Sequence, residues 1–72
     1  MEPRCYRITI RKRLSARLAS AFEGVSVEYS GGETSLVGVV DQSQLFGILD
    51  RVRDFGLELE RVETVGGNQR AS

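Results

Sequence analysis

The sequence contains no histidine and only one cysteine, Cys5. Without histidine, the chain has neither the commonest general base nor the commonest zinc ligand. One cysteine can form neither an intramolecular disulfide nor a metal-binding pair, and no second thiol is present to resolve an oxidised Cys5. We therefore expect no metal, no cofactor and no catalytic site, and hence a protein that is not an enzyme.

Long apolar runs are also missing. The longest extends from Leu36 to Val40, which is too short to cross a membrane, and no secretory signal pattern opens the chain. We expect a cytoplasmic protein without a membrane partner. With 72 residues, of which 40% are hydrophobic, the chain forms one small domain, expected over residues 1–65. Residues 66–72 have no apolar anchor and are expected to form a flexible tail.

The formal net charge of zero hides an asymmetry along the chain. Residues 1–20 carry six basic side chains against one acidic side chain, giving +5, and residues 21–72 carry four against nine, giving −5. Such segregation is typical of an anion-binding or self-complementary surface. Folding can also neutralise it by placing basic and acidic strands side by side, and we favour this interpretation.

The first half of the chain reads as strand, helix, strand. Residues 6–10 alternate between apolar and polar, which predicts a half-buried strand. Apolar residues then recur every four positions over residues 14–22, which predicts a helix with Ser15 as its N-cap and Gly24 just past its end. Residues 25–29 resume the alternation of a strand.

The second half repeats the strand and helix after a tight turn. Gly31-Gly32 supplies the backbone freedom that a hairpin needs before a third strand over residues 34–40. Asp41, with Gln44 three residues later, predicts a capping box. An amphipathic helix follows, with apolar positions within residues 45–52 and its end near Phe55-Gly56.

A last strand is expected to begin at Leu57, and the change of parity at Val62 predicts a bulge near Glu60-Arg61. The resulting order, βαββαβ, predicts an α+β ferredoxin-like sandwich over residues 5–65. Its four-stranded antiparallel sheet should have the order 4-1-3-2, with both helices on one face.

The segments RITIRKRLSARLASAFEG and DQSQLFGILDRVRDFGLELERVE resemble small bacterial proteins with this ferredoxin-like pattern, most of which have no assigned function. The resemblance implies the fold and a cytoplasmic setting, and it brings no active site with it. The fold alone does not settle the function, because unrelated functions use it. RNA-recognition domains of this shape stack bases on central aromatic side chains, and residues 34–40 contain none.

Basic side chains cluster where the first strand leads into the first helix: Arg11, Lys12, Arg13 and Arg17. Together with free N–H groups at a helix N-terminus, they could bind an anion or a nucleic acid. The competing interpretation is a solvated loop, with Arg7 and Arg11 paired across the sheet to Glu58 or Glu60.

One face of the sheet should remain uncovered, because two helices can cover only the other. If Ile8 and Ile10 point at the helices, Arg7 points away, together with either Leu36 and Val40 or Val37 and Val39. We take Val37, Val39 and Arg7 as candidate interface residues.

We expect a non-enzymatic interaction or regulatory module, a homodimer or higher homo-oligomer formed through this face or through the strand at residues 25–29. A separate protein partner would fit the same surface. Anion or nucleic-acid binding is the alternative. Sensing of a small effector at a subunit interface is a weaker alternative, because the loop after the first strand lacks the glycine that ligand-sensing domains of this fold usually have.

Overall fold

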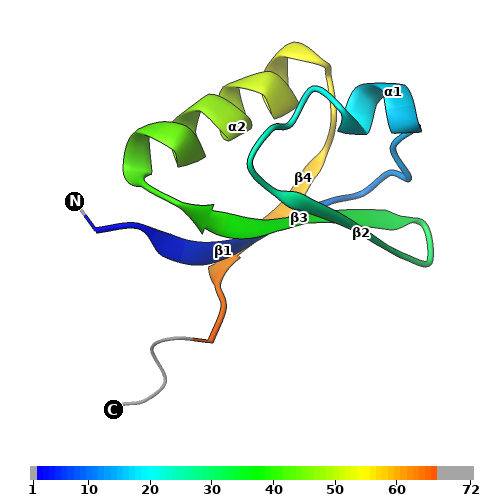
Figure 1. The fold of residues 1–72 in the computed structure, drawn as a ribbon. Coiled ribbons are helices and arrows are strands. Elements are labelled where there is room, and N and C mark those ends of the chain that lie inside the picture. The colour runs from blue at the N-terminus through cyan, green and yellow to red at the C-terminus, as the bar shows by residue number, and fades with distance from the viewer. Residues whose placement is uncertain (1, 67–72) are drawn as a thin grey trace.

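The computed structural model describes residues 2–66 and contains the six predicted elements in the predicted order (Figure 1). They are β1 (Arg4–Ile10), α1 (Ala16–Ala19), β2 (Ser26–Ser30), β3 (Glu33–Val40), α2 (Gln42–Asp54) and β4 (Leu59–Thr64). Of the tail predicted at residues 66–72, all but Gly66 lies outside the described residues.

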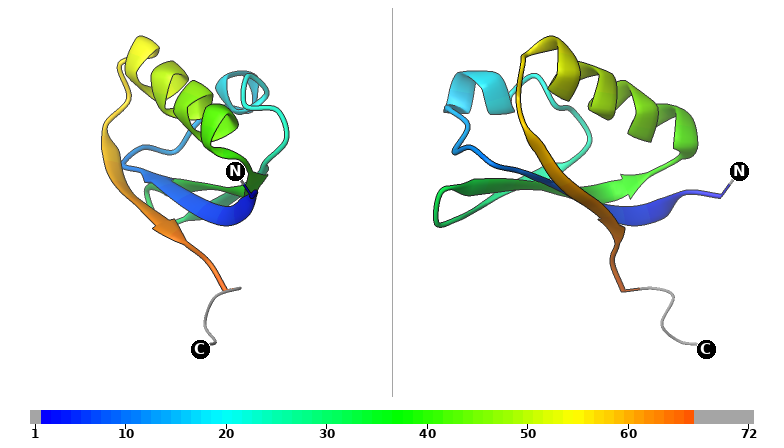
Figure 2. Two further views of the ribbon diagram at one scale, coloured as in Figure 1. Left: turned by 90° about the vertical axis from the view of Figure 1, so that its left-hand side faces the viewer. Right: turned by 180° about the vertical axis from the view of Figure 1, so that it is seen from behind.

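The four strands form one antiparallel sheet in the order β2-β3-β1-β4. This is the predicted order 4-1-3-2 read from the opposite edge. Both helices lie on the same side of the sheet (Figures 1 and 2). The prediction of an α+β fold with a four-stranded antiparallel sheet and two helices is confirmed.

The core lies between the sheet and the helices. The sheet contributes Ile8, Ile10, Leu36 and Val40, and the rest of the chain contributes Leu14, Ala19, Phe22, Leu45, Ile48 and Val52. Because Leu36 and Val40 are at most 2% exposed, the helix-facing side of β3 is settled. Val37 and Val39 therefore belong to the opposite face.

The first helix is shorter than predicted. Over the predicted residues 14–22, only Ala16–Ala19 are helical, with Ser15 as the predicted N-cap. Beyond Ala19 the backbone tightens, because Phe22 N–H donates to the carbonyl three residues earlier at 3.1 Å. Leu14 and Phe22 are still buried, so the four-residue apolar spacing is satisfied by the flanking turns as well as by the helix.

The second helix begins with the predicted capping box. The N–H of Gln44 donates to Asp41 Oδ1 at 2.8 Å, and the N–H of Asp41 donates to Gln44 Oε1 at 2.9 Å. Phe55 is the C-cap, and Gly56 follows with a φ of +69°. Both ends of α2 were thus predicted correctly.

The predicted bulge in β4 is confirmed, although the strand begins at Leu59 and not at Leu57. Thr9 lies opposite Arg61, and the next residue of β1, Ile10, lies opposite Leu59. Glu60 is therefore the additional residue of β4. The bulge lets Leu59 and Val62 lie on the same face of the sheet, opposite Ile10 and Ile8.

Candidate interaction surfaces

The face of the sheet turned away from the helices is here called the open face. Its side chains follow from the strand register: Cys5, Arg7 and Thr9 of β1, Ser35, Val37 and Val39 of β3, Ser26, Glu28 and Ser30 of β2, and Arg61, Glu63 and Val65 of β4 and its end. The three predicted interface residues lie together on this face, since Arg7 lies directly opposite Val37, and Val39 is two residues farther along β3. That they contact a partner stays a prediction.

An ion pair crosses the middle of the open face. Arg7 of β1 reaches over β3 to Glu28 of β2, with 3.1 Å between Nη1 and Oε1. The predicted pairing of Arg7 with Glu58 or Glu60 is wrong. Glu58 precedes β4 and Glu60 lies at its start, whereas Arg7 lies opposite Glu63, nearer the other end of that strand.

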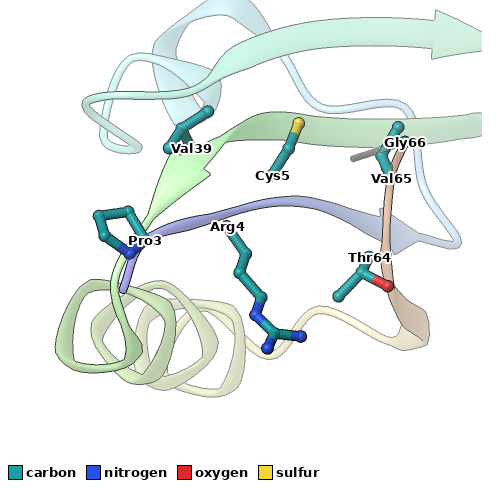
Figure 3. Close-up of a pocket in the computed structure, with 7 residues that line it drawn as sticks. All are labelled: Pro3, Arg4, Cys5, Val39, Thr64, Val65 and Gly66. Atoms are coloured by element: carbon teal, nitrogen blue, oxygen red, sulfur yellow. The ribbon is translucent and has the colours of Figure 1, made fainter. Parts of the chain in front are cut away.

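One end of the open face is apolar. Val39 is 64% exposed there, and Cys5 and Val65 beside it are half-buried. Figure 3 shows Cys5 and Val39 pointing to one side of the sheet, and Arg4 and Thr64 pointing to the other. A surface pocket of about 410 Å³ lies at this end, which is at the small end of the range for ligand pockets. We call Cys5, Val39 and Val65 the apolar end.

Arg11, the first residue of the predicted basic cluster, is paired. Its Nε lies 2.8 Å from Glu60 Oε1, and its Nη1 lies 3.4 Å from Glu58 Oε2. These carboxylates, Glu60 first, raise the pKa of the Arg11 guanidinium above its ordinary value. The predicted cross-strand neutralisation is therefore confirmed for Arg11.

Arg13 is also engaged, because its guanidinium carbon lies 4.3 Å from the centre of the Tyr29 ring. The Tyr29 hydroxyl donates to the carbonyl of Leu14 at 3.0 Å. Within residues 2–66, neither Lys12 nor Arg17 forms an ion pair. Of the four basic side chains, Arg11 and Arg13 thus contact other side chains of the fold, whereas Lys12 and Arg17 form no ion pair within the described residues.

Thr34 fixes the loop that carries these basic residues. Its hydroxyl donates to the carbonyl of Lys12 at 2.7 Å and accepts from the N–H of Leu14 at 2.9 Å. The side chain is completely buried. Ser15 takes a further N–H, that of Leu18, at 3.2 Å. The N–H groups of Leu14 and Leu18 are therefore already hydrogen-bonded within the chain and are not free to bind an anion.

The outer edge of β4 is a surface that the sequence reasoning missed. β4 is the last strand of the sheet, and all six of its residues are exposed. Leu59 and Val62 are among the exposed large hydrophobic residues, at 43% and 37%. In the view from behind in Figure 2, β4 runs in front of the other strands. The available signal was the charge pattern Glu60-Arg61-Val62-Glu63, whose meaning depends on β4 being an edge.

In the part of the chain that the structure describes, no group of three or more metal-ligating side chains comes together. The helices found there are too short or too polar to span a membrane. A model of a protein family, described as a domain of unknown function (DUF8691), matches residues 5–63. The match includes all four strands apart from the first residue of β1 and the last residue of β4. No curated protein and no solved structure matches the chain.

Proposed function

The chain belongs to the family of this domain of unknown function, and because that membership names no activity, we propose a function from the geometry. The protein is a non-enzymatic interaction module that works by self-association in the cytoplasm of a bacterial cell. Its fold is of the ferredoxin-like class, which the element order, the strand order and the common side of the two helices support.

One observation carries this proposal: the sheet is only partly covered by its own chain. The helices cover one face and leave the other without a covering layer, and β4 ends the sheet with every residue exposed. Exposed strand edges offer unpaired backbone donors and acceptors to another chain. Exposed apolar side chains accompany both surfaces, Val39 on the open face and Val62 at the edge.

A second copy of the chain is the occupant that fits this surface. The chain has no net charge to repel its copy, and it presents both signs of charge on the same strand. Specific contacts bury at least about 1,000 Å² in total, so each copy would cover roughly a tenth of its accessible surface of 4641 Å².

Anion or nucleic-acid binding remains the second candidate, because Lys12 and Arg17 are exposed and unpaired within residues 2–66. It has less support than self-association, since Arg11 and Arg13 are committed to Glu60 and Tyr29. A fluorescence titration with RNA or DNA at about 150 mM salt tests it. Binding that weakens as salt rises and is lost on changing Lys12 and Arg17 to Ala would favour this candidate.

Sedimentation equilibrium of the full chain tests self-association directly. We expect the average mass to rise from one chain to two between about 10 and 500 µM, because small interfaces give dissociation constants in the micromolar range or weaker. A mass of one chain over the whole range would contradict the proposal. Val39→Asp examines the open face, and Phe46→Asp is its control, because Phe46 is similarly exposed but lies on α2.

A further inference from the structure

We propose that two copies of the chain join through β4, which pairs antiparallel with β4 of the second copy about a two-fold axis at Val62. This inference rests on the proposed self-association and names the contact that produces it. The occupant of the edge is therefore a second copy of this chain, and the two sheets continue into one another.

The backbone of β4 has the polarity that this pairing needs. The N–H of Val65 donates to the carbonyl of Cys5 at 2.9 Å, so Val65 directs its backbone groups toward β1. Backbone groups alternate along an antiparallel strand, so Glu63 and Arg61 also face β1. The N–H and C=O of Val62 and Thr64 therefore point to the free outer edge. At the axis, each Val62 can donate to and accept from Val62 of the second copy.

The charges of β4 select one register. With Val62 opposite Val62, Arg61 of each copy lies opposite Glu63 of the other, so two cross-strand pairs of opposite sign form. A shift of two residues one way places Arg61 against Arg61. The same shift the other way places Glu63 against Glu63. Of these three registers, only the one centred on Val62 is free of like charges, and it alone places Arg61 opposite Glu63.

Within residues 2–66, Arg61 has ion-pair partners only on its own strand. Its Nε lies 3.3 Å from Glu63 Oε2, and its Nη1 lies 3.5 Å from Glu60 Oε2. Arg61 is half exposed in this arrangement, and Glu63 nearly so, so both can turn toward a neighbouring strand. Pairing exchanges the Arg61–Glu63 contact within each of the two strands for two such contacts between the strands.

Apolar burial supports the same register. Val62 lies opposite Ile8 and Leu59 lies opposite Ile10, so both point to the helix side of the sheet. They are nevertheless 37% and 43% exposed, because no strand flanks them on the outside. A second copy of β4 brings Val62 against Val62 on this side and removes apolar surface from water.

The contact joins two copies and adds no third one, because it uses the β4 edge of both. The bulge at Glu60 interrupts the regular ladder, which limits the paired segment to the residues around Val62. The other edge strand, β2, has Glu28 as its single charged side chain, and Glu28 is paired with Arg7. No register of β2 against itself forms a pair of opposite charges. A dimer, and not an extended sheet, is the expected product.

Two single charge reversals and their mixture test the inference by sedimentation of the full chain. Arg61→Glu places a new carboxylate against Glu63 of the second copy, and Glu63→Arg places a new guanidinium against Arg61 of the second copy. We expect each variant alone to dimerise at least about tenfold more weakly than the native chain, because like charges lie directly opposite. In a mixture of the two variants, like charges are avoided at both cross-strand positions only if unlike chains pair. We therefore expect a heterodimer in which each facing pair of residues again has opposite charges, with nearly native affinity.

Arg17→Glu, on α1, is the control for net charge and should dimerise like the native chain. It makes the same change from a basic to an acidic side chain as Arg61→Glu, but away from β4. Circular dichroism of each variant checks that a lost dimer is not lost folding.

The outcomes separate the inference from the proposed function. A native dimer that neither charge reversal weakens would overturn the β4 contact and leave self-association standing. If Val39→Asp abolishes the dimer while the β4 variants do not, the open face is the contact. Variants that each lose the dimer but fail to recombine on mixing would also overturn the register. A native chain that stays a monomer contradicts both proposals.

Discussion

The β2–β3 hairpin and β4 flank the same central strand, β1, and they use their side chains in opposite ways. The polar side chains of the hairpin reach into the rest of the fold. Thr34 and Tyr29 hold the loop after β1, and Glu28 pairs with Arg7. Removing any of these contacts should therefore lower the stability of the folded chain.

The side chains of β4 serve the fold much less. All six residues are exposed, and the ion pairs of Arg61 stay within the strand. Glu60 is the exception, because the bulge places it against Arg11. The comparison indicates that polar residues of the hairpin serve stability, whereas those of β4 beyond the bulge are available for contact with another chain. Substitutions on the two sides should therefore affect different measurements.

The largest effect is expected from Thr34→Val, which keeps the volume of a buried side chain and removes its hydroxyl. The carbonyl of Lys12 and the buried N–H of Leu14 would each lose their hydrogen-bond partner. We expect the free energy of unfolding, measured with urea, to fall by about 2–4 kcal/mol. The control is Thr64→Val, the same change on exposed β4, with an expected effect within about 0.5 kcal/mol. Equal losses at both positions would remove the distinction between the two regions.

A smaller loss is expected from Gly38→Ala in β3. A Cβ at Gly38 would lie 2.9 Å from the carbonyl oxygen of Gly24 and 2.9 Å from Val25 Cγ1, so the segment leading into β2 would have to move. We expect a loss of about 1–3 kcal/mol from this overpacking. The matched control is Gly47→Ala, because no atom lies within 4 Å of a Cβ there and alanine favours the helix. Unchanged stability of Gly38→Ala would show that the hairpin is less tightly held than we argue.

Most of the fold follows from local patterns in the sequence. Alternation identifies the strands, and the capping box and Gly56 mark the ends of α2, because these signals depend only on neighbouring residues. The length of α1 does not follow in this way. The backbone of Leu14 is held by a hydrogen bond to Thr34, twenty residues away, and a four-residue spacing does not distinguish a helix from a helix with turns at both ends.

The surfaces follow from the sequence only in part. The open face can be predicted once the strand order is known, but its charges depend on reach and register. Arg7 crosses a whole strand to find Glu28, and the bulge at Glu60 brings that carboxylate to Arg11. The close approach at Gly38 and the outward backbone groups of Val62 require three-dimensional placement. A pattern of period two contains no information on which neighbour lies beside a strand.

The smallest effect on stability is expected from Arg61→Ala. Its two ion pairs are exposed and lie within β4, and exposed pairs contribute about 0–1 kcal/mol. At a concentration where the chain is monomeric, we expect the free energy of unfolding to change by less than about 0.5 kcal/mol. Arg7→Ala is the informative counterpart, because Arg7 is only 33% exposed and its ion pair spans β3, so its removal should lower the free energy of unfolding by more.

The same Arg61→Ala variant should weaken self-association, since each copy loses its partner for Glu63. If Arg61→Ala weakens self-association but leaves the free energy of unfolding of the monomer unchanged, Arg61 is a contact residue. A loss of more than about 1 kcal/mol in the monomer would instead make Arg61 part of the fold, and the difference between the hairpin and β4 would disappear.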